Sequence, residues 1–193
     1  MRTCCFIGHR KIDDTPELRD KLKKTLLALL ENGVREFIFG DHSQFDDLCY
    51  EAVTELKEVY PDIKRIRYRP DYPGELDEYS KQFFLDGYED NICPEGVEGA
   101  GRLSYVKRNE AMIMASDICV SYYDKNYQPK PRKISKNALT SYQLKSGTRI
   151  AFEFAVQKNK KIINLYDETV YEQNNNKVLD KVQNHRQNRK YRK

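Results

Sequence analysis

Three short polar stretches of this chain bring glycine next to hydroxyl, acidic or cationic side chains. They are Gly8-His9-Arg10, Gly40-Asp41-His42-Ser43 and Ser146-Gly147-Thr148. The third stretch opens a helical pattern, and the unbonded N–H groups at a helix N-terminus bind anions. A phosphate-bearing ligand is therefore the first chemistry that the sequence predicts.

The stretch Gly8-His9-Arg10 follows the first apolar run of the chain. A small residue followed by two side chains that can carry positive charge suits a phosphate. The plainer alternative is a turn that ends a strand, with Arg10 on the surface. The histidines and cysteines show no metal-binding spacing, so we expect no metal and no cofactor other than a nucleotide ligand.

The elements that must position these stretches alternate between strand and helix. Apolar runs of strand length occupy 3–7, 36–39, 63–68, 91–93, 118–123 and 161–166. Helical periodicity occupies 16–31, with Thr15 as the cap, and then 45–59, 75–88, 106–115 and 148–157. Parallel strands need crossover connections, so the alternation predicts an α/β fold with a mostly parallel sheet and helices on both faces. Ligands bind such sheets at the carboxyl ends of the strands, where the polar stretches fall.

The length of 193 residues and the composition indicate one domain with a full core. No apolar stretch reaches the roughly 20 residues of a membrane span. The N-terminal run Cys4–Ile7 is too short for the core of a signal peptide, so a cytoplasmic protein is expected. The five cysteines include no Cys-x-x-Cys pair, which predicts reduced and mostly buried thiols.

The net charge of +4 is unevenly distributed along the chain. Residues 177–193 hold seven basic residues and one acid, and the insert 125–145 holds six basic residues and no acid, so the remainder is net acidic. The C-terminal segment is either a solvated end or a contact for nucleic acid or another polyanion. The insert is either a mobile lid over a phosphorylated ligand or a loose excursion without a ligand role.

Four motifs in this chain together resemble those of one family. In chain order they are Thr3-Cys-Cys-Phe-Ile-Gly-His-Arg10, Phe39-Gly-Asp-His-Ser-Gln-Phe-Asp46, Arg108-Asn109 and Ser146-Gly147-Thr148. On these motifs the chain resembles the YpsA-like branch of the SLOG superfamily, a Rossmann-like group that includes Smf/DprA DNA-processing proteins and Lonely-guy phosphoribohydrolases. The resemblance implies a Rossmann-like three-layer α/β/α domain over residues 1–168 and a basic, flexible tail at 169–193.

The resemblance also implies that a nucleotide or nucleotide derivative binds at these motifs. The implied ligand-binding residues are Gly8, His9, Arg10, Gly40, Asp41, Ser43, Asp46, Arg108, Asn109, Ser146, Gly147 and Thr148. Asp46 is either a charge partner at a helix start or an acceptor for a ribose hydroxyl. Asp41 and Gln44 replace glycines of related proteins, so this turn has less backbone freedom and an added negative charge.

Three function classes stay open at this point. Lonely-guy hydrolases carry a catalytic glutamate three residues after the threonine of their Gly-Thr turn, and this chain has Ala151 there. Glu153 lies about 200° further around the helix. A nucleotide sensor or regulator is therefore favoured over a phosphoribohydrolase, which would need Asp46, Asp117, Asp124 or Glu153 as its carboxylate. The third class is a single-stranded DNA-binding module of the Smf/DprA type, favoured by the basic tail and insert. A homodimer is compatible with each class.

Overall fold

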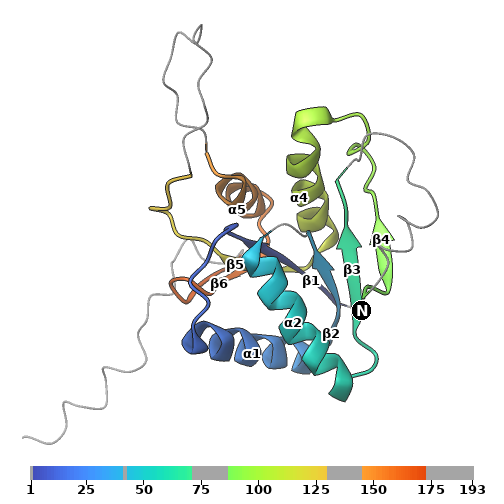
Figure 1. Ribbon diagram of the computed structural model, residues 1–193, viewed down its shortest axis with the longest axis vertical. Coiled ribbons are helices and arrows are strands. Elements are labelled where there is room, and N and C mark those ends of the chain that lie inside the picture. The colour runs from blue at the N-terminus through green and yellow to red at the C-terminus, as the bar shows by residue number, and fades with distance from the viewer. Residues whose placement is uncertain (1, 41–42, 71–86, 130–144, 173–193) are drawn as a thin grey trace, which may run out of the picture.

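The computed structural model describes residues 2–40, 43–70, 87–129 and 145–172. Within these residues, seven strands form one sheet in the order β4-β3-β2-β1-β5-β6-β7 (Figure 1). Every neighbouring pair is parallel except β6 and β7, which are antiparallel. The strands are β1 (Arg2–Gly8), β2 (Val34–Phe39), β3 (Lys64–Tyr68), β4 (Asp90–Ile92), β5 (Ile118–Tyr122), β6 (Lys161–Asn164) and β7 (Thr169–Tyr171).

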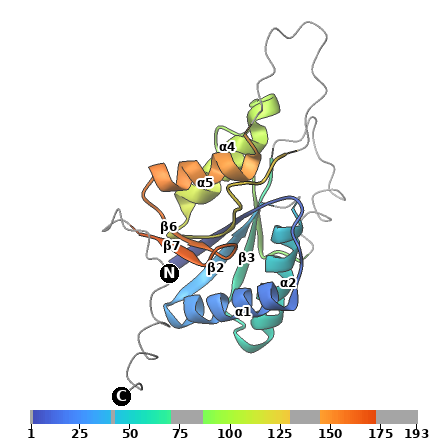
Figure 2. The same cartoon turned by 90° about the vertical axis from the view of Figure 1, so that its left-hand side faces the viewer.

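Helices cover both faces of this sheet (Figure 2). On one face lie α1 (Pro16–Glu31) and α2 (Gln44–Val59), and on the other lie α4 (Ser104–Ala115) and α5 (Gly147–Gln157). A short 3-10 turn at Gly101–Leu103 leads into α4. The structure confirms the predicted α/β fold, a Rossmann-like three-layer arrangement with a mostly parallel sheet.

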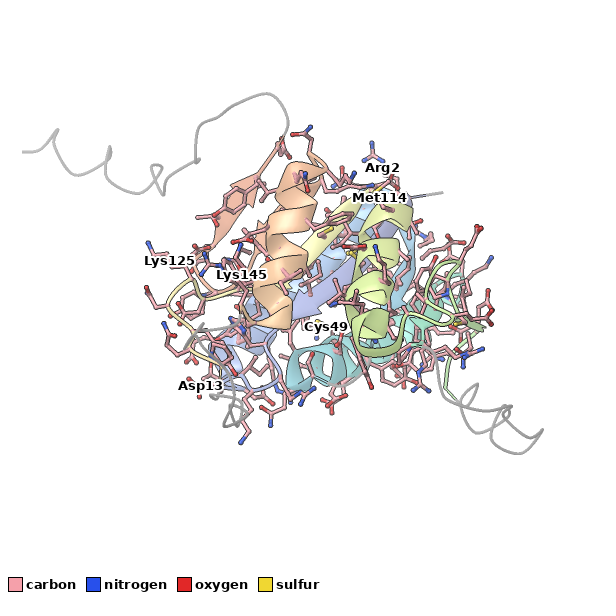
Figure 3. All side chains as sticks on the ribbon, turned by 90° about the horizontal axis from the view of Figure 1, so that it is seen from above. Arg2, Asp13, Cys49, Met114, Lys125 and Lys145 are labelled. Carbon is pink, nitrogen blue, oxygen red and sulfur yellow. The ribbon has the colours of Figure 1, made fainter. Side chains whose placement is uncertain are left out.

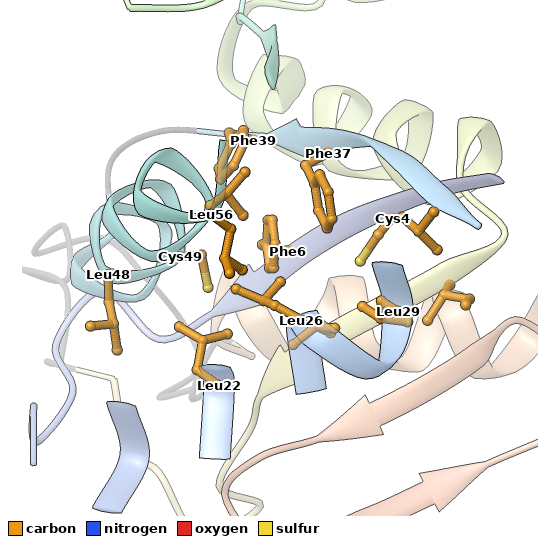
Figure 4. Close-up of a cluster of buried hydrophobic side chains, with 14 of the residues drawn as sticks. Cys4, Phe6, Leu22, Leu26, Leu29, Phe37, Phe39, Leu48, Cys49 and Leu56 are labelled. Atoms are coloured by element: carbon orange, nitrogen blue, oxygen red, sulfur yellow. The ribbon is translucent and has the colours of Figure 1, made fainter. Parts of the chain in front are cut away.

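The sheet separates two apolar layers, because successive residues of a strand point to opposite faces. On β1, Cys4 and Phe6 face α1 and α2, whereas Cys5 and Ile7 face α4 and α5. In the first layer, the ring of Phe6 stacks on the ring of Phe39 with 5.0 Å between centroids (Figure 4). Buried helix residues pack on the sheet in both layers. The central strands therefore hold the loops at the edge of the sheet in place.

Hydroxyl side chains begin three of the helices. Thr15, Ser43 and Ser146 immediately precede α1, α2 and α5, and each accepts a hydrogen bond from a backbone N–H in the first turn. The predicted starts of these helices therefore hold to within one residue. The end of α1 is also as predicted, since Gly33 follows it with a φ of 82°, in the left-handed region that favours glycine.

Two parts of the predicted organisation differ from the structure or lie outside it. The tail was predicted to begin at residue 169, but Thr169–Tyr171 forms β7 and pairs with β6, so the folded unit extends further. A strand of three residues is too short to show a hydrophobic period, which explains why it was missed. The predicted helix 75–88, the insert 125–145 and the tail fall mostly outside the described residues, because the description stops at 70, 129 and 172.

The end of β1 packs so closely against α2 that Gly8 has no room for a side chain. A Cβ atom at Gly8 would lie 2.2 Å from a ring carbon of Phe45. We expect Gly8→Ala to lower the free energy of unfolding by about 1–3 kcal/mol, the usual cost of overpacking. Chemical denaturation measures this change. Gly147→Ala is the matched control, because a Cβ atom there meets nothing within 4 Å. Equal stability of Gly8→Ala and wild type would contradict the packing.

Candidate functional site

The strand order reverses beside β1. The chain leaves β1 toward β2, β3 and β4 on one side and later returns to β5 and β6 on the other. The loops that follow β1 and β5 therefore diverge at the carboxyl edge of the sheet, and open α/β sheets bind their ligands at such a switch point.

Two hydrogen bonds join three chain segments at this switch point. The backbone N–H of Asp124, after β5, donates to Nε2 of His9 at 3.0 Å. The hydroxyl of Thr148, in the first turn of α5, donates to the carbonyl oxygen of Gly8 at 2.8 Å. The ends of β1 and β5 and the N-terminus of α5 thus meet at one place.

His9 is buried at the switch point as a neutral imidazole, with an exposed fraction of 2%. Because Nε2 accepts the hydrogen bond from Asp124, the ring proton resides on Nδ1. Burial lowers the pKa of His9, and the carboxylate of Asp124 opposes this shift without cancelling it. The Nδ1 donor meets no acceptor among the described residues. His9 therefore offers a ligand an N–H donor, in place of the positive charge that the sequence suggested.

Two tyrosines lie beside the imidazole of His9. The ring of Tyr127 stacks on it with 4.0 Å between centroids, and the ring of Tyr123 lies at 5.9 Å. Tyr123 also stacks on Phe152 of α5 at 4.4 Å, which connects this aromatic group to the second apolar layer. Tyr127 belongs to the first residues of the basic insert, so the described start of the insert lies over His9.

The N-termini of α5 and α2 differ in charge. Ser146 caps α5 by accepting a hydrogen bond from the N–H of Arg149, and the first turn of α5 contains no acidic residue. The first turn of α2 contains Asp46 and Asp47. An anion is stabilised by the partial positive charge at a helix start and repelled by carboxylates there. The start of α5 is therefore the better phosphate site of the two.

Ser43 and Asp46 bond to each other at the start of α2. The hydroxyl of Ser43 accepts from the N–H of Asp46 at 2.9 Å and donates to its carboxylate at 2.8 Å. Both residues are buried. This geometry gives Asp46 a role in beginning the helix, the first of its two predicted alternatives.

Arg10 is exposed after β1, and Asp41 lies outside the described residues.

Arg108 is buried against the ends of β2 and β3, with an exposed fraction of 5%. Its guanidinium donates to the side-chain oxygen of Asn109 at 3.0 Å and to the carbonyl of Tyr68 at 3.5 Å. A Cβ atom at Gly40 would lie 2.9 Å from the guanidinium carbon, so glycine leaves room for this side chain. Gly40, Arg108 and Asn109 thus form a second group at the carboxyl edge, on the other side of β1 from β5.

The two positions on α5 that bear on hydrolysis face different surroundings. Ala151 is buried in the layer between α5 and the sheet. Glu153 is partly exposed and forms ion pairs with Lys145 at 2.6 Å and Arg149 at 2.9 Å. Hydrogen bonds from Lys145 and Arg149 lower the pKa of Glu153, so this carboxylate is ionised at neutral pH. A carboxylate with a lowered pKa and two ion-pair partners is a weak base, so it is poorly suited to activate water.

Exposed cations surround the switch point. Arg10 and Lys11 follow β1, Lys125 follows β5, and Lys145 precedes α5. Lys125 and Lys145 lie on the α5 side of the molecule (Figure 3). Carboxylates lie at the same edge, among them Asp13 and Asp124 near Tyr122, and the chain outside the basic insert and C-terminal segment is net acidic.

The structure brings five of the predicted site residues together at the switch point: Gly8, His9, Ser146, Gly147 and Thr148. It places Gly40, Arg108 and Asn109 at the neighbouring strand ends and Ser43 and Asp46 at the start of α2. Tyr123 and Asp124 were not among the predicted ligand-binding residues. Their position at the end of the apolar run 118–123 was the signal that could have included them.

The described part of the chain lacks two further kinds of feature. No helix there is long and apolar enough to cross a membrane. No group of three or more histidine, cysteine, aspartate or glutamate side chains there could hold a metal ion.

A family model named YpsA, described as the YspA SLOG family, matches residues 9–152. The chain belongs to this family. No curated protein sequence matches the chain. Among solved structures, DNA processing protein A from Helicobacter pylori is similar, with 16% identity and a TM-score of 0.49. That structure was reported for its single-stranded DNA binding mode, and the similarity covers 83% of this chain and 63% of that chain, which is less than two thirds of its length.

In this SLOG family member, the buried His9 makes stability depend on pH. The pKa of His9 in the folded chain is lower than its ordinary value of 6.5, so the unfolded chain takes up the proton first as the pH falls. We expect the free energy of unfolding to decline below about pH 6.5 and to level off below the folded-state pKa. Chemical denaturation at a series of pH values measures this decline.

The matched variant for this measurement is His9→Gln, whose amide oxygen can replace Nε2 as the acceptor for Asp124. It lacks a titrating ring, so its stability should change less than that of wild type over the same pH interval. The same decline in both proteins would show that His9 is not the responsible group.

Proposed function

We propose that the chain binds a nucleotide or a phosphorylated nucleotide derivative at the switch point between β1 and β5, and that it acts as a sensor or regulator. The observation that carries this proposal is the Nδ1 donor of His9, which is buried and meets no acceptor among the described residues. A buried donor without an acceptor costs about 1–3 kcal/mol. A ligand oxygen that accepts from Nδ1 would recover part of this cost.

The phosphate group is proposed to lie at the N-terminus of α5. Ser146 already caps one N–H, and Gly147 leaves the adjoining backbone open because no atom lies within 4 Å of where its Cβ would be. The first turn of α5 carries no acid, and its Thr148 is fixed to Gly8 beside His9. The same short region therefore supports both an anion and a hydrogen-bond acceptor.

The second group at the edge is proposed to hold a further polar part of the ligand. Arg108 supplies a buried positive charge, and Asn109 supplies an amide beside it. Both lie at the ends of β2 and β3, next to β1. A ligand longer than a phosphate alone is needed to reach both groups, which favours a nucleotide over inorganic phosphate.

The donor on His9 is tested by calorimetry with AMP. We expect His9→Gln to weaken AMP binding by about 0.5–1.5 kcal/mol, the net value of a neutral hydrogen bond, because the variant lacks a donor at the Nδ1 position. The variant keeps the acceptor for Asp124, and a thermal melt near neutral pH controls for its folding. Wild-type affinity in a folded variant would remove His9 from the site.

The proposed sensor role predicts that the chain does not release adenine from AMP at an enzymatic rate. Cleavage of the N-glycosidic bond needs a carboxylate that activates water, and the matching position holds Ala151, which is buried. Loss of acid–base catalysis costs about 10²–10⁴-fold in rate. Chromatography of free base after incubation with nucleoside monophosphates measures this. Sustained turnover that disappears in Asp46→Asn or Glu153→Gln would show that another carboxylate has taken the role.

Contact with nucleic acid is a second candidate function, favoured by the exposed cations Arg10, Lys11 and Lys125 together with the basic segments of the sequence. Salt separates the two candidates. Polyanion binding through many cations weakens steeply as salt rises, whereas binding of one mononucleotide through few charges changes much less.

A further inference from the structure

The two tyrosines beside His9 are held in very different ways. The backbone N–H of Tyr123 donates to Oδ1 of Asn164 at 2.9 Å, and the carbonyl of Tyr123 accepts from Nδ2 of Asn164 at 3.0 Å. The ring of Tyr123 also stacks on Phe152. Tyr123 is therefore a fixed wall of the site.

Tyr127 is held by local contacts and by its stack on His9. Its backbone N–H donates to the carbonyl of Asp124 at 3.2 Å, and the Asp124 carboxylate accepts from the N–H of Asn126 at 2.8 Å. Within the described residues, the hydroxyl of Tyr127 has no hydrogen-bond partner. One short turn and one ring contact therefore determine where this side chain lies.

We propose that Tyr127 occupies the place of a nucleobase on the imidazole of His9, and that a ligand with a planar heteroaromatic base displaces it. This inference rests on the proposed function, because the phosphate at α5 would bring the base to the switch point. This inference limits the ligand to phosphorylated compounds that carry such a base. A sugar phosphate without a base would fill only the phosphate part of the site.

The exchange is favourable for three physical reasons. A nucleobase stacks on an aromatic side chain more strongly than two aromatic side chains stack on each other. Displacement of Tyr127 breaks no hydrogen bond of its hydroxyl to the described residues, since it makes none there. The imidazole that receives the base is neutral and fixed by Asp124, so the stacking surface is present before the ligand arrives.

The test compares AMP with ribose 5-phosphate in the full chain, by calorimetry. We expect Tyr127→Ala to tighten AMP binding by about 2- to 12-fold, the equivalent of one aromatic pair that no longer competes. Ribose 5-phosphate should bind wild type and variant equally, because it has no base. Tyr60→Ala is the matched control, since Tyr60 follows the C-terminal end of the 16-residue helix α2, away from His9.

A second measurement follows the ring itself. The chain contains no tryptophan, so Tyr127→Trp introduces a single tryptophan, whose emission can be excited apart from that of the tyrosines. We expect AMP to move its emission to longer wavelength and to increase its quenching by iodide, because the ring leaves His9 for solvent. Ribose 5-phosphate should produce neither change.

The outcomes separate this inference from the proposed function. Weaker AMP binding in Tyr127→Ala would show that Tyr127 clamps the base instead of yielding to it. Unchanged AMP affinity, or tryptophan emission that AMP does not move, would show that the base lies elsewhere while the nucleotide site stands. Absence of binding by both AMP and ribose 5-phosphate in wild type would overturn the proposed function and this inference together.

Discussion

The parallel pairing of β1 with β5 is the constraint on which the candidate site depends. The register runs from Cys4 opposite Ile118 to Gly8 opposite Tyr122. It determines which residues leave the sheet side by side, namely His9 from β1 and Tyr123 from β5. A slip of one residue would turn each side chain to the opposite face. The hydrogen bond between Asp124 and His9 exists only in the observed register.

Features with local causes could be predicted from the sequence. Thr15 before Pro16 and the leucine spacing that follows are sufficient to place α1, and the structure has this helix at Pro16–Glu31. The neutral state of His9 is different, because it comes from burial at a place to which the chain returns only at Asp124, 115 residues later. The burial of Arg108 likewise arises from the packing of α4 over the end of β2, where Gly40 admits it. Neither contact can be recognised from the residues that are next to it in the sequence.

One face of α5 shows why a shared fold need not carry a shared reaction. Thr148 uses its hydroxyl to bind Gly8, and Ala151, about one turn later, packs into the layer that contains Cys5 and Cys119. A glutamate at position 151 would place a carboxylate in this apolar layer, where an unpaired charge is costly. In this chain the inner face of α5 therefore serves packing, while its N-terminus stays available to an anion.

The strand order also has a consequence during translation. β1 is complete at residue 8, but its second neighbour β5 ends at Tyr122. At about 5–20 residues per second, the ribosome needs roughly 6–23 seconds to make the intervening chain. Until then, one edge of the central strand and the layer under α5 have no partner, and such surfaces attract other nascent chains. The central strand can therefore gain its second neighbour only after more than half of the chain has been made.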